Sequence, residues 1–387
     1  MNISKVNKMK IILSSLLSSF LLFSSSEALA LGGIESLKID QFCNVKSPRQ
    51  TLIYIDDDII EKDDTQWALQ LINKIMTNLM PSEPVTLVKL SSELGSTEER
   101  WKACYPDITV AELEKRKESI GFLEKLLTTD ASKQLKEQKT VFKAQMTGAL
   151  EKILTEKSQQ KSKSSTVKKQ IIRALENDIA RFDNRNGAIR VIIYSDMLEN
   201  SDLISSQNSS VLEAKKLAEA RKLNFQNAVF HIFGSGKSGN IKGLKSFWEE
   251  FIDGGAGNLA DIGSELILTS KPPDSLKVYD VEIEITKDDI RRGTLRLFID
   301  NDSKLQESVV TIGTKQRSLL DDGEFLCQQD HCSLQAKARR PLIVAEGKEE
   351  FKLTGTVDNL SGKLQIPNTQ LNNGKNAIFD MTIKLSK

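Results

Sequence analysis

The stretch "TLIYIDDDIIE", residues 51–61, joins an apolar run to three consecutive aspartates. Its first residues barely alternate between apolar and polar, which predicts a strand buried on both faces, as in a parallel sheet. Asp56, Asp57 and Asp58 then follow at the carboxyl end of that strand. Ligands bind beyond the carboxyl ends of the strands in open parallel sheets. The stretch therefore predicts both a fold class and the place of a site.

Strand and helix patterns alternate after this stretch. A helix is expected after Thr65, and a strand is expected over 85–90, "VTLVKL". The same rhythm resumes beyond residue 167, with helices expected over 167–182, 209–223 and 241–253 and strands over 188–196 and 227–233. Such an alternation is typical of βαβ units. We predict a doubly wound, mostly parallel α/β sheet within residues 31–270.

A charged helical insertion interrupts this domain at about 109–165. Thr109 and Glu112 have the spacing of a capping box, and apolar residues then recur at helical spacing. Two helices, broken near 128–132, fit this pattern. The insertion is either a protruding arm that binds a partner or a segment that packs its apolar stripe on the domain.

The last part of the chain, 276–387, has a different pattern. Short alternating segments such as "KVYDVEIEIT" and "AIFDMTIKL" are separated by Gly, Asn and Asp turns. The stretch "SKPPDS", 270–275, precedes them as a linker. This pattern predicts an all-β, immunoglobulin-like sandwich of six to eight strands.

Residues 1–30 have the layout of a secretory signal peptide: a basic start, an apolar core over 11–23, and Ala28 and Ala30 at the expected cleavage site. The apolar core is shorter than the roughly 20 residues that a membrane span needs. We therefore expect a periplasmic or secreted protein without a membrane span after cleavage, and an uncleaved anchor is the alternative.

Four cysteines in an exported chain are expected to form disulfides. Cys327 and Cys332 bracket a short loop and are predicted to pair, which leaves Cys43 to pair with Cys104. A zinc site that uses Cys327, His331 and Cys332 is the alternative, but a second pair of ligands is lacking nearby.

The overall composition excludes some classes of function. Lys and Arg number 54 against 53 Asp and Glu, a net charge of +1 that argues against nucleic acid as a partner. His231 and His331 are the only histidines, which leaves little for a Ser-His-acid triad. "HIFGSGKSG", 231–239, lacks the first glycine of a phosphate-binding loop and is expected to be a turn after a strand.

A second strand also ends in acid. "AIRVIIYSD", 188–196, ends at Asp196. If this strand lies beside the first, Asp56, Asp58 and Asp196 converge on one crevice, where three hard oxygen ligands suit Mg²⁺ or a similar cation. The alternative is that the acids simply favour strand ends and turns.

Residues 48–270 resemble the von Willebrand factor A (VWA) family. The resemblance is carried by "YIDDDII", "KSSTVKKQIIRAL", "IIYSDMLENSD" and "FWEEFIDGGAGN". The family's metal-ion-dependent adhesion site uses Asp-x-Ser-x-Ser, a Thr from a second loop and an Asp after the fourth strand. By position, the resemblance implies Asp56 as the leading Asp, Thr166 (or Ser165) as the Thr and Asp196 as the last Asp, around Mg²⁺ or Mn²⁺.

The adhesion-site pattern is incomplete. Asp58 stands in place of the first Ser and can still offer an oxygen, whereas Ile60 stands in place of the second and cannot. The same letters resemble haloacid-dehalogenase-like phosphatases, in which Asp56 would be the nucleophile and Asp58 the general acid. Ile60 departs from that pattern as well.

We find no convincing catalytic or cofactor-binding set, so we expect a non-enzymatic role. The preferred expectation is a protein-binding or assembly factor of the cell envelope, with Asp56, Asp58, Thr166 and Asp196 around a cation that accepts a carboxylate from a partner. The metal-dependent phosphatase is one alternative. A metal-free scaffold that acts through the helical insertion or the sandwich is the other.

Overall fold

The computed structural model describes eleven stretches of the chain. The described residues are 42–61, 64–107, 131–159, 169–183, 187–204, 211–235, 241–269, 271–314, 316–343, 348–367 and 376–386. Met1–Leu37 and Lys38–Lys387 are separate units. The predicted signal peptide and residues 109–130 and 160–165 of the helical insertion lie outside the described residues.

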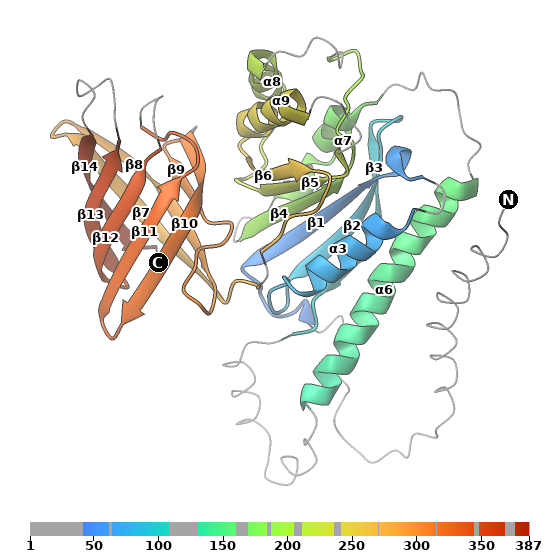
Figure 1. Cartoon of the computed structure of the whole chain (residues 1–387), viewed down its shortest axis with the longest axis horizontal. Helices are drawn as coiled ribbons and strands as arrows, with labels where there is room; N and C mark the ends of the chain where they lie inside the picture. The colour runs from blue at the N-terminus through green and yellow to red at the C-terminus, as the bar shows by residue number, and fades with distance from the viewer. Residues whose placement is uncertain are drawn as a thin grey trace, which may run out of the picture. The chain divides into compact units, whose positions relative to one another are not determined.

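A six-stranded sheet forms the first part of the larger unit, in the order β3-β2-β1-β4-β5-β6 (Figure 1). Its strands are β1 (Arg49–Asp56), β2 (Pro84–Ser91), β3 (Ser96–Cys104), β4 (Ala188–Tyr194), β5 (Val229–Phe233) and β6 (Asn258–Gly263). All neighbours are parallel except β3, which is antiparallel to β2. The strand order reverses between β1 and β4, and these two strands are neighbours, which meets the condition on which the expected crevice depends.

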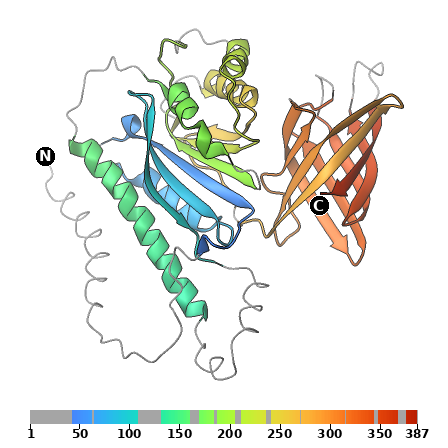
Figure 2. The same cartoon turned by 180° about the vertical axis from the view of Figure 1, so that it is seen from behind.

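Helices cover both faces of this sheet (Figures 1 and 2). One face carries α3 (Gln66–Met76) and α6 (Ala131–Gln159), and the other carries α7 (Ile171–Asn177), α8 (Val211–Ala220) and α9 (Ile241–Gly254). Successive side chains of a strand point to opposite faces. In β1, Ile53 and Ile55 therefore join one core and Leu52 and Tyr54 the other. The expected doubly wound α/β architecture is present.

Helix α6 packs along the sheet. Phe142, Met146, Leu150 and Ile153 recur at helical spacing and are fully or almost fully buried in the core that α3 also joins. For this helix, the interpretation that the insertion packs its apolar stripe on the domain is confirmed. Among the described residues, no helix has the length and apolar character needed to cross a membrane.

The last part of the chain is a closed barrel, not the predicted sandwich. Its strands are β7 (Ser275–Thr286), β8 (Asp289–Ile299), β9 (Val309–Ile312), β10 (Gln316–Gln328), β11 (His331–Ala338), β12 (Glu350–Thr356), β13 (Asn359–Ile366) and β14 (Ala377–Leu385). Each strand pairs antiparallel with the next, and β14 pairs with β7, which closes the barrel. Register shifts in β7 and β10 are the bulges that let long strands bend around such a barrel.

The interior of the barrel is apolar. Alternate residues of its strands, such as Tyr279, Val281 and Ile283 on β7, form one buried core. A barrel of eight strands is just wide enough for side chains to fill. The same period of two occurs in a sandwich. The predicted strands are therefore present, and the prediction was wrong only in how the sheet closes.

Both predicted disulfides are present. Cys43 joins Cys104 at the end of β3, with Cα atoms 5.2 Å apart. Cys327 joins Cys332 across the β10–β11 hairpin, with Cα atoms 4.1 Å apart. Because both thiols of the hairpin are used, the zinc alternative at this hairpin is wrong.

A buried charge cluster joins the barrel to the sheet. Glu307, between β8 and β9, accepts hydrogen bonds from Arg49 at 3.1 Å and lies 3.1 Å from Nε2 of His231. Arg49 also pairs with Glu83 at 2.9 Å, and Glu83 lies 3.3 Å from Arg190. Burial opposes the charge on Glu307, but Arg49 and Arg190 hold the pKa of its carboxyl well below its usual range. His231 is thus a structural residue of this junction, as expected from its place inside a strand.

Candidate functional site at the carboxyl ends of the central strands

The three consecutive aspartates fold back on one another directly after β1. Asp56 ends the strand, and a single 3₁₀ turn over Asp57–Ile59 follows. Oδ1 of Asp56 accepts a hydrogen bond from the backbone N–H of Asp58 at 3.1 Å, which fixes this turn. One carboxylate oxygen from each of Asp56, Asp57 and Asp58 lies within 4.8 Å of the other two. We call these three residues and Asp196 the acidic edge.

Asp56 is completely buried between two serines. Ser195, which follows β4, donates its hydroxyl hydrogen to Oδ2 of Asp56 at 2.7 Å. The hydroxyl of Ser92, in the turn between β2 and β3, lies 3.0 Å from Oδ1 of Asp56. Burial raises the pKa of Asp56 to about 6, although Lys169 and the Ser195 hydroxyl oppose the shift. Asp56 therefore carries its charge less readily than an ordinary aspartate.

Asp58 is the best-compensated carboxylate of the three. It accepts hydrogen bonds from the backbone N–H of Glu93 at 3.0 Å, from the Ser92 hydroxyl, and from Nζ of Lys157 at 3.2 Å. Partial burial opposes ionisation, but Ser92 and Lys157 lower the pKa of Asp58 below its usual range. Ser92 thus lies between two carboxylates with a single hydroxyl hydrogen to donate.

Asp57 points toward β2 and α6. Nζ of Lys89 on β2 lies 3.1 Å from Oδ2 of Asp57 and 3.4 Å from a carboxylate oxygen of Glu156 on α6. Oδ1 of Asp57 is buried and has no hydrogen-bond partner among the described residues. Burial raises the pKa of Asp57, and the contact with Lys89 opposes this shift.

Asp196 follows β4 and is paired with a lysine. Nζ of Lys169 donates to Oδ2 of Asp196 at 2.5 Å, and the backbone N–H of Leu198 donates to Oδ1 at 3.1 Å. Asp196 is not part of the tight group of three carboxylates, although its charge contributes to raising the pKa of Asp56. The predicted ligand Thr166 lies outside the described residues.

Five polar residues of this site were missed in the sequence: Ser92, Ser195, Lys89, Lys157 and Lys169. Ser195 immediately precedes Asp196, and Ser92 follows the second strand, so the rule that strand ends meet at one edge could have identified both serines. The lysines come from α6, β2 and the segment before α7, and no spacing in the sequence links them to the aspartates.

The donor types at the acidic edge are those that Mg²⁺ and Mn²⁺ prefer, since carboxylates and hydroxyls are hard oxygen ligands. However, every carboxylate oxygen of Asp56, Asp58 and Asp196 already accepts a hydrogen bond from the protein. Asp58 and Asp196 also have lysine partners. As the side chains lie, this set does not fit a directly bound ion. A buried group of carboxylates is present, and bound Mg²⁺ or Mn²⁺ stays a prediction.

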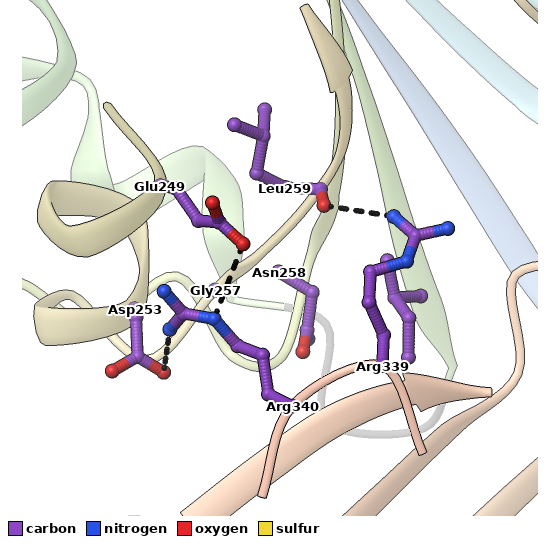
Figure 3. A pocket seen from close by; sticks show the side chains of 8 residues that line it. Glu249, Asp253, Gly257, Asn258, Leu259, Arg339 and Arg340 are labelled. Carbon is purple, nitrogen blue, oxygen red and sulfur yellow. Dashed lines mark hydrogen bonds and ion pairs between the residues drawn. The ribbon is translucent and has the colours of Figure 1, made fainter. Parts of the chain in front are cut away.

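A small pocket lies elsewhere, where the barrel meets α9 and β6 (Figure 3). Nε of Arg340 lies 3.3 Å from Glu249, and Nη1 of Arg340 lies 3.2 Å from Asp253. Arg339 donates to the backbone carbonyl of Leu259 at 3.2 Å, on the edge strand of the sheet. Because these charged groups bind one another and the edge backbone, the pocket is a structural junction rather than a ligand site.

No protein-family model and no curated protein matches the chain. Among solved structures, the ArnB paralog VWA2 from Sulfolobus acidocaldarius is similar over 81% of this chain and 66% of its own, with 8% identity and a TM-score of 0.28. The human COPII-coat protein Sec24c is similar over 88% of this chain and 44% of its own, with 9% identity and a TM-score of 0.31. This chain spans less than two thirds of either protein.

Proposed function

We propose that the chain is a protein-binding or assembly module that contacts its partner at the acidic edge. The observation that carries this proposal is the meeting of Asp56, Ser92 and Ser195 where the strand order reverses, the usual place for ligands in such sheets. The resemblance of residues 48–270 to the VWA family supports a binding role at this place.

Exposed apolar side chains near this edge support contact with a protein. Leu94 follows Ser92 in the β2–β3 turn and is 72% exposed, and Leu198 follows Asp196 and is 36% exposed. Gly95, at φ +60°, adopts a conformation that favours glycine and lets this turn lead into β3. Protein interfaces combine an apolar centre with a polar rim, and these two leucines supply exposed apolar surface beside the charged edge.

The proposed location is outside the cytosol, in the periplasm or beyond the cell, with partners in the cell envelope. The two disulfides support this location, because disulfides persist in oxidising compartments. The signal-peptide pattern of residues 1–30 gives the same expectation.

Site-specific photo-crosslinking tests the proposal. A photoreactive phenylalanine placed at Leu94 should give a discrete adduct in the native envelope, and the adduct should be lost in Asp58→Lys. The control is the same probe at Ile378 on the barrel, which is 57% exposed. Equal adducts from both positions, or an adduct that Asp58→Lys leaves intact, would refute a binding site at this edge.

We also propose that the chain is not an enzyme. In the phosphatase alternative Asp56 must reach a phosphate as nucleophile, yet its side chain is completely buried and accepts hydrogen bonds on both oxygens. We expect no turnover of a generic phosphate ester with Mg²⁺. Turnover that Asp56→Asn abolishes would establish the phosphatase instead.

A further inference from the structure

Two lysines pair with the two most exposed carboxylates of the acidic edge. Nζ of Lys157 lies 3.2 Å from Asp58, and the side chains are 25% and 16% exposed. Nζ of Lys169 lies 2.5 Å from Asp196, and the side chains are 20% and 15% exposed. These two ammonium groups therefore lie beside two of the ligands that the resemblance implies for a metal ion.

The last turn of α6 holds one of these lysines in place. Glu156, next to Lys157, accepts a hydrogen bond from Arg100 on β3 at 3.0 Å and lies 3.4 Å from Lys89. The end of the helix is thus fixed to the sheet by side chains on both of its last charged positions. Because the end of α6 is anchored in this way, the contact between Lys157 and Asp58 is fixed by the fold and is not a chance surface pair.

Positive charge beside the carboxylates of the acidic edge offsets their mutual repulsion. Two carboxylates about 4 Å apart repel one another by roughly 4 kcal/mol at an effective dielectric constant of about 20. Either a divalent cation or protein ammonium groups can offset that repulsion. Both cannot occupy the same oxygens, because an ammonium group and a metal ion repel one another.

We propose that Lys157 and Lys169 are the resident counter-ions of the acidic edge and take the place that a divalent cation has in an adhesion site. The wild-type edge then binds no Mg²⁺ or Mn²⁺, and loss of a lysine opens the carboxylates to a cation. The inference concerns the site of the proposed function but rests on contacts within the chain. Its test needs no partner, so the two proposals can fail separately.

Thermal unfolding of the purified full chain, with and without Mg²⁺ or Mn²⁺, tests this inference. The wild type should show no shift in Tm with either ion. Lys169→Met and Lys157→Met keep the aliphatic stem and remove the charge, so each should unfold at a lower Tm and regain the loss when the ion is added. The matched control is Lys139→Met on the same helix, whose partner Asp107 is 2.8 Å away and outside the acidic edge.

A second variant covers the case in which a single lysine substitution prevents folding. Lys169→Met with Asp196→Asn removes both charges of one pair, and this double variant should fold without responding to the ion. A shift in wild-type Tm as large as that of the lysine variants would overturn the inference. So would a normal Tm without ion response in Lys157→Met and Lys169→Met, because the lysines would then not act as counter-ions.

Discussion

Asp56 is the residue on which the acidic edge depends. Its carboxyl is completely buried, caps the turn that places Asp58, and is hydrogen-bonded by Ser195 from the neighbouring strand. Burial disfavours a charged carboxylate, and here it outweighs the hydrogen bonds, since the pKa of Asp56 is raised to about 6. The Asp56 side chain therefore stabilises the fold more through its hydrogen bonds than through its charge.

The raised pKa of Asp56 makes stability depend on pH. An aspartate in an unfolded chain has a pKa of about 3.9, so between about pH 4 and pH 6 the folded state keeps a proton that the unfolded state has released. The contribution of Asp56 is complete below about pH 4 and is lost as the pH rises through about 6. Asp56→Asn does not titrate, so its free energy of unfolding should rise relative to that of the wild type by about 1–3 kcal/mol between pH 4 and pH 7.

Denaturant unfolding of both proteins at pH 4 and pH 7 measures this effect. The difference between the two proteins isolates Asp56, because other titrating groups are common to both. A difference that stays constant between the two pH values would contradict the raised pKa.

At the scale of single residues, the aspartates could be predicted and their partners could not. Asp56 and Asp196 follow apolar strands, and parallel strands end at one edge. Lys157 reaches the same edge from a helix about 100 positions along the chain, through tertiary packing that leaves no local signal. The sequence therefore indicated where charge gathers but not how it is balanced.

Among the elements, the packing of α6 shows whether this part of the insertion is a protruding arm or part of the core. Phe142 is fully buried against the rings of Trp101 and Tyr105, with ring centroids 5.0 and 5.5 Å away. The adjacent Val141 is 39% exposed. Because one position faces the sheet and the next faces solvent, the two are matched probes of the packing.

Phe142→Ala should lower the free energy of unfolding by about 3–5 kcal/mol, since it removes a buried aromatic side chain and leaves a cavity. Val141→Ala should change it by about 0.5 kcal/mol or less. Equal effects of the two substitutions in denaturant unfolding would mean that α6 is not packed as described.

Strand β3 shows why an element can be missed. Its sequence, "STEERWKAC", is charged and its side chains are mostly half-buried or exposed, so it lacks the apolar alternation of a strand. It lies at the edge of the sheet, and its pairing with β2 is interrupted by a register shift. Charges and irregular pairing are common protections of edge strands, and they remove the sequence signal by which strands are identified.

For the whole molecule, the junction around Glu307 joins the sheet to the barrel, whose apolar core is distinct from the two cores of the sheet. Glu307 is the barrel's contribution to a buried cluster that also contains Arg49, Arg190 and His231 of the sheet. Removing one partner from a buried ion pair costs more than the pair contributes, because a charge is left buried without compensation. The junction should therefore be sensitive to loss of Glu307.

Glu307→Gln should lower the free energy of unfolding by about 3 kcal/mol or more at neutral pH. Asp302→Asn, in the same β8–β9 segment, is the control, because its pair with Lys271 is more than half exposed and should contribute about 1 kcal/mol or less. Equal losses in the two variants would contradict the buried junction.

The barrel shows the limit of sequence patterns for whole architectures. The alternation that predicts "KVYDVEIEIT" as a strand is the same whether the sheet closes on itself or packs on a second sheet. Closure depends on the pairing of β14 with β7, between residues about 100 positions apart. The strands could therefore be predicted, while their closure needed long-range pairing that no local pattern contains.

The central claim is that the acidic edge binds a protein partner, and that Lys157 and Lys169 supply the positive charge there in place of a metal ion. Photo-crosslinking from position 94 in the presence of a chelator tests it most directly. We predict that the wild-type adduct persists with the chelator, is lost in the double variant Lys157→Met and Lys169→Met, and returns in that variant when Mn²⁺ is added. A wild-type adduct that disappears with the chelator would contradict this account.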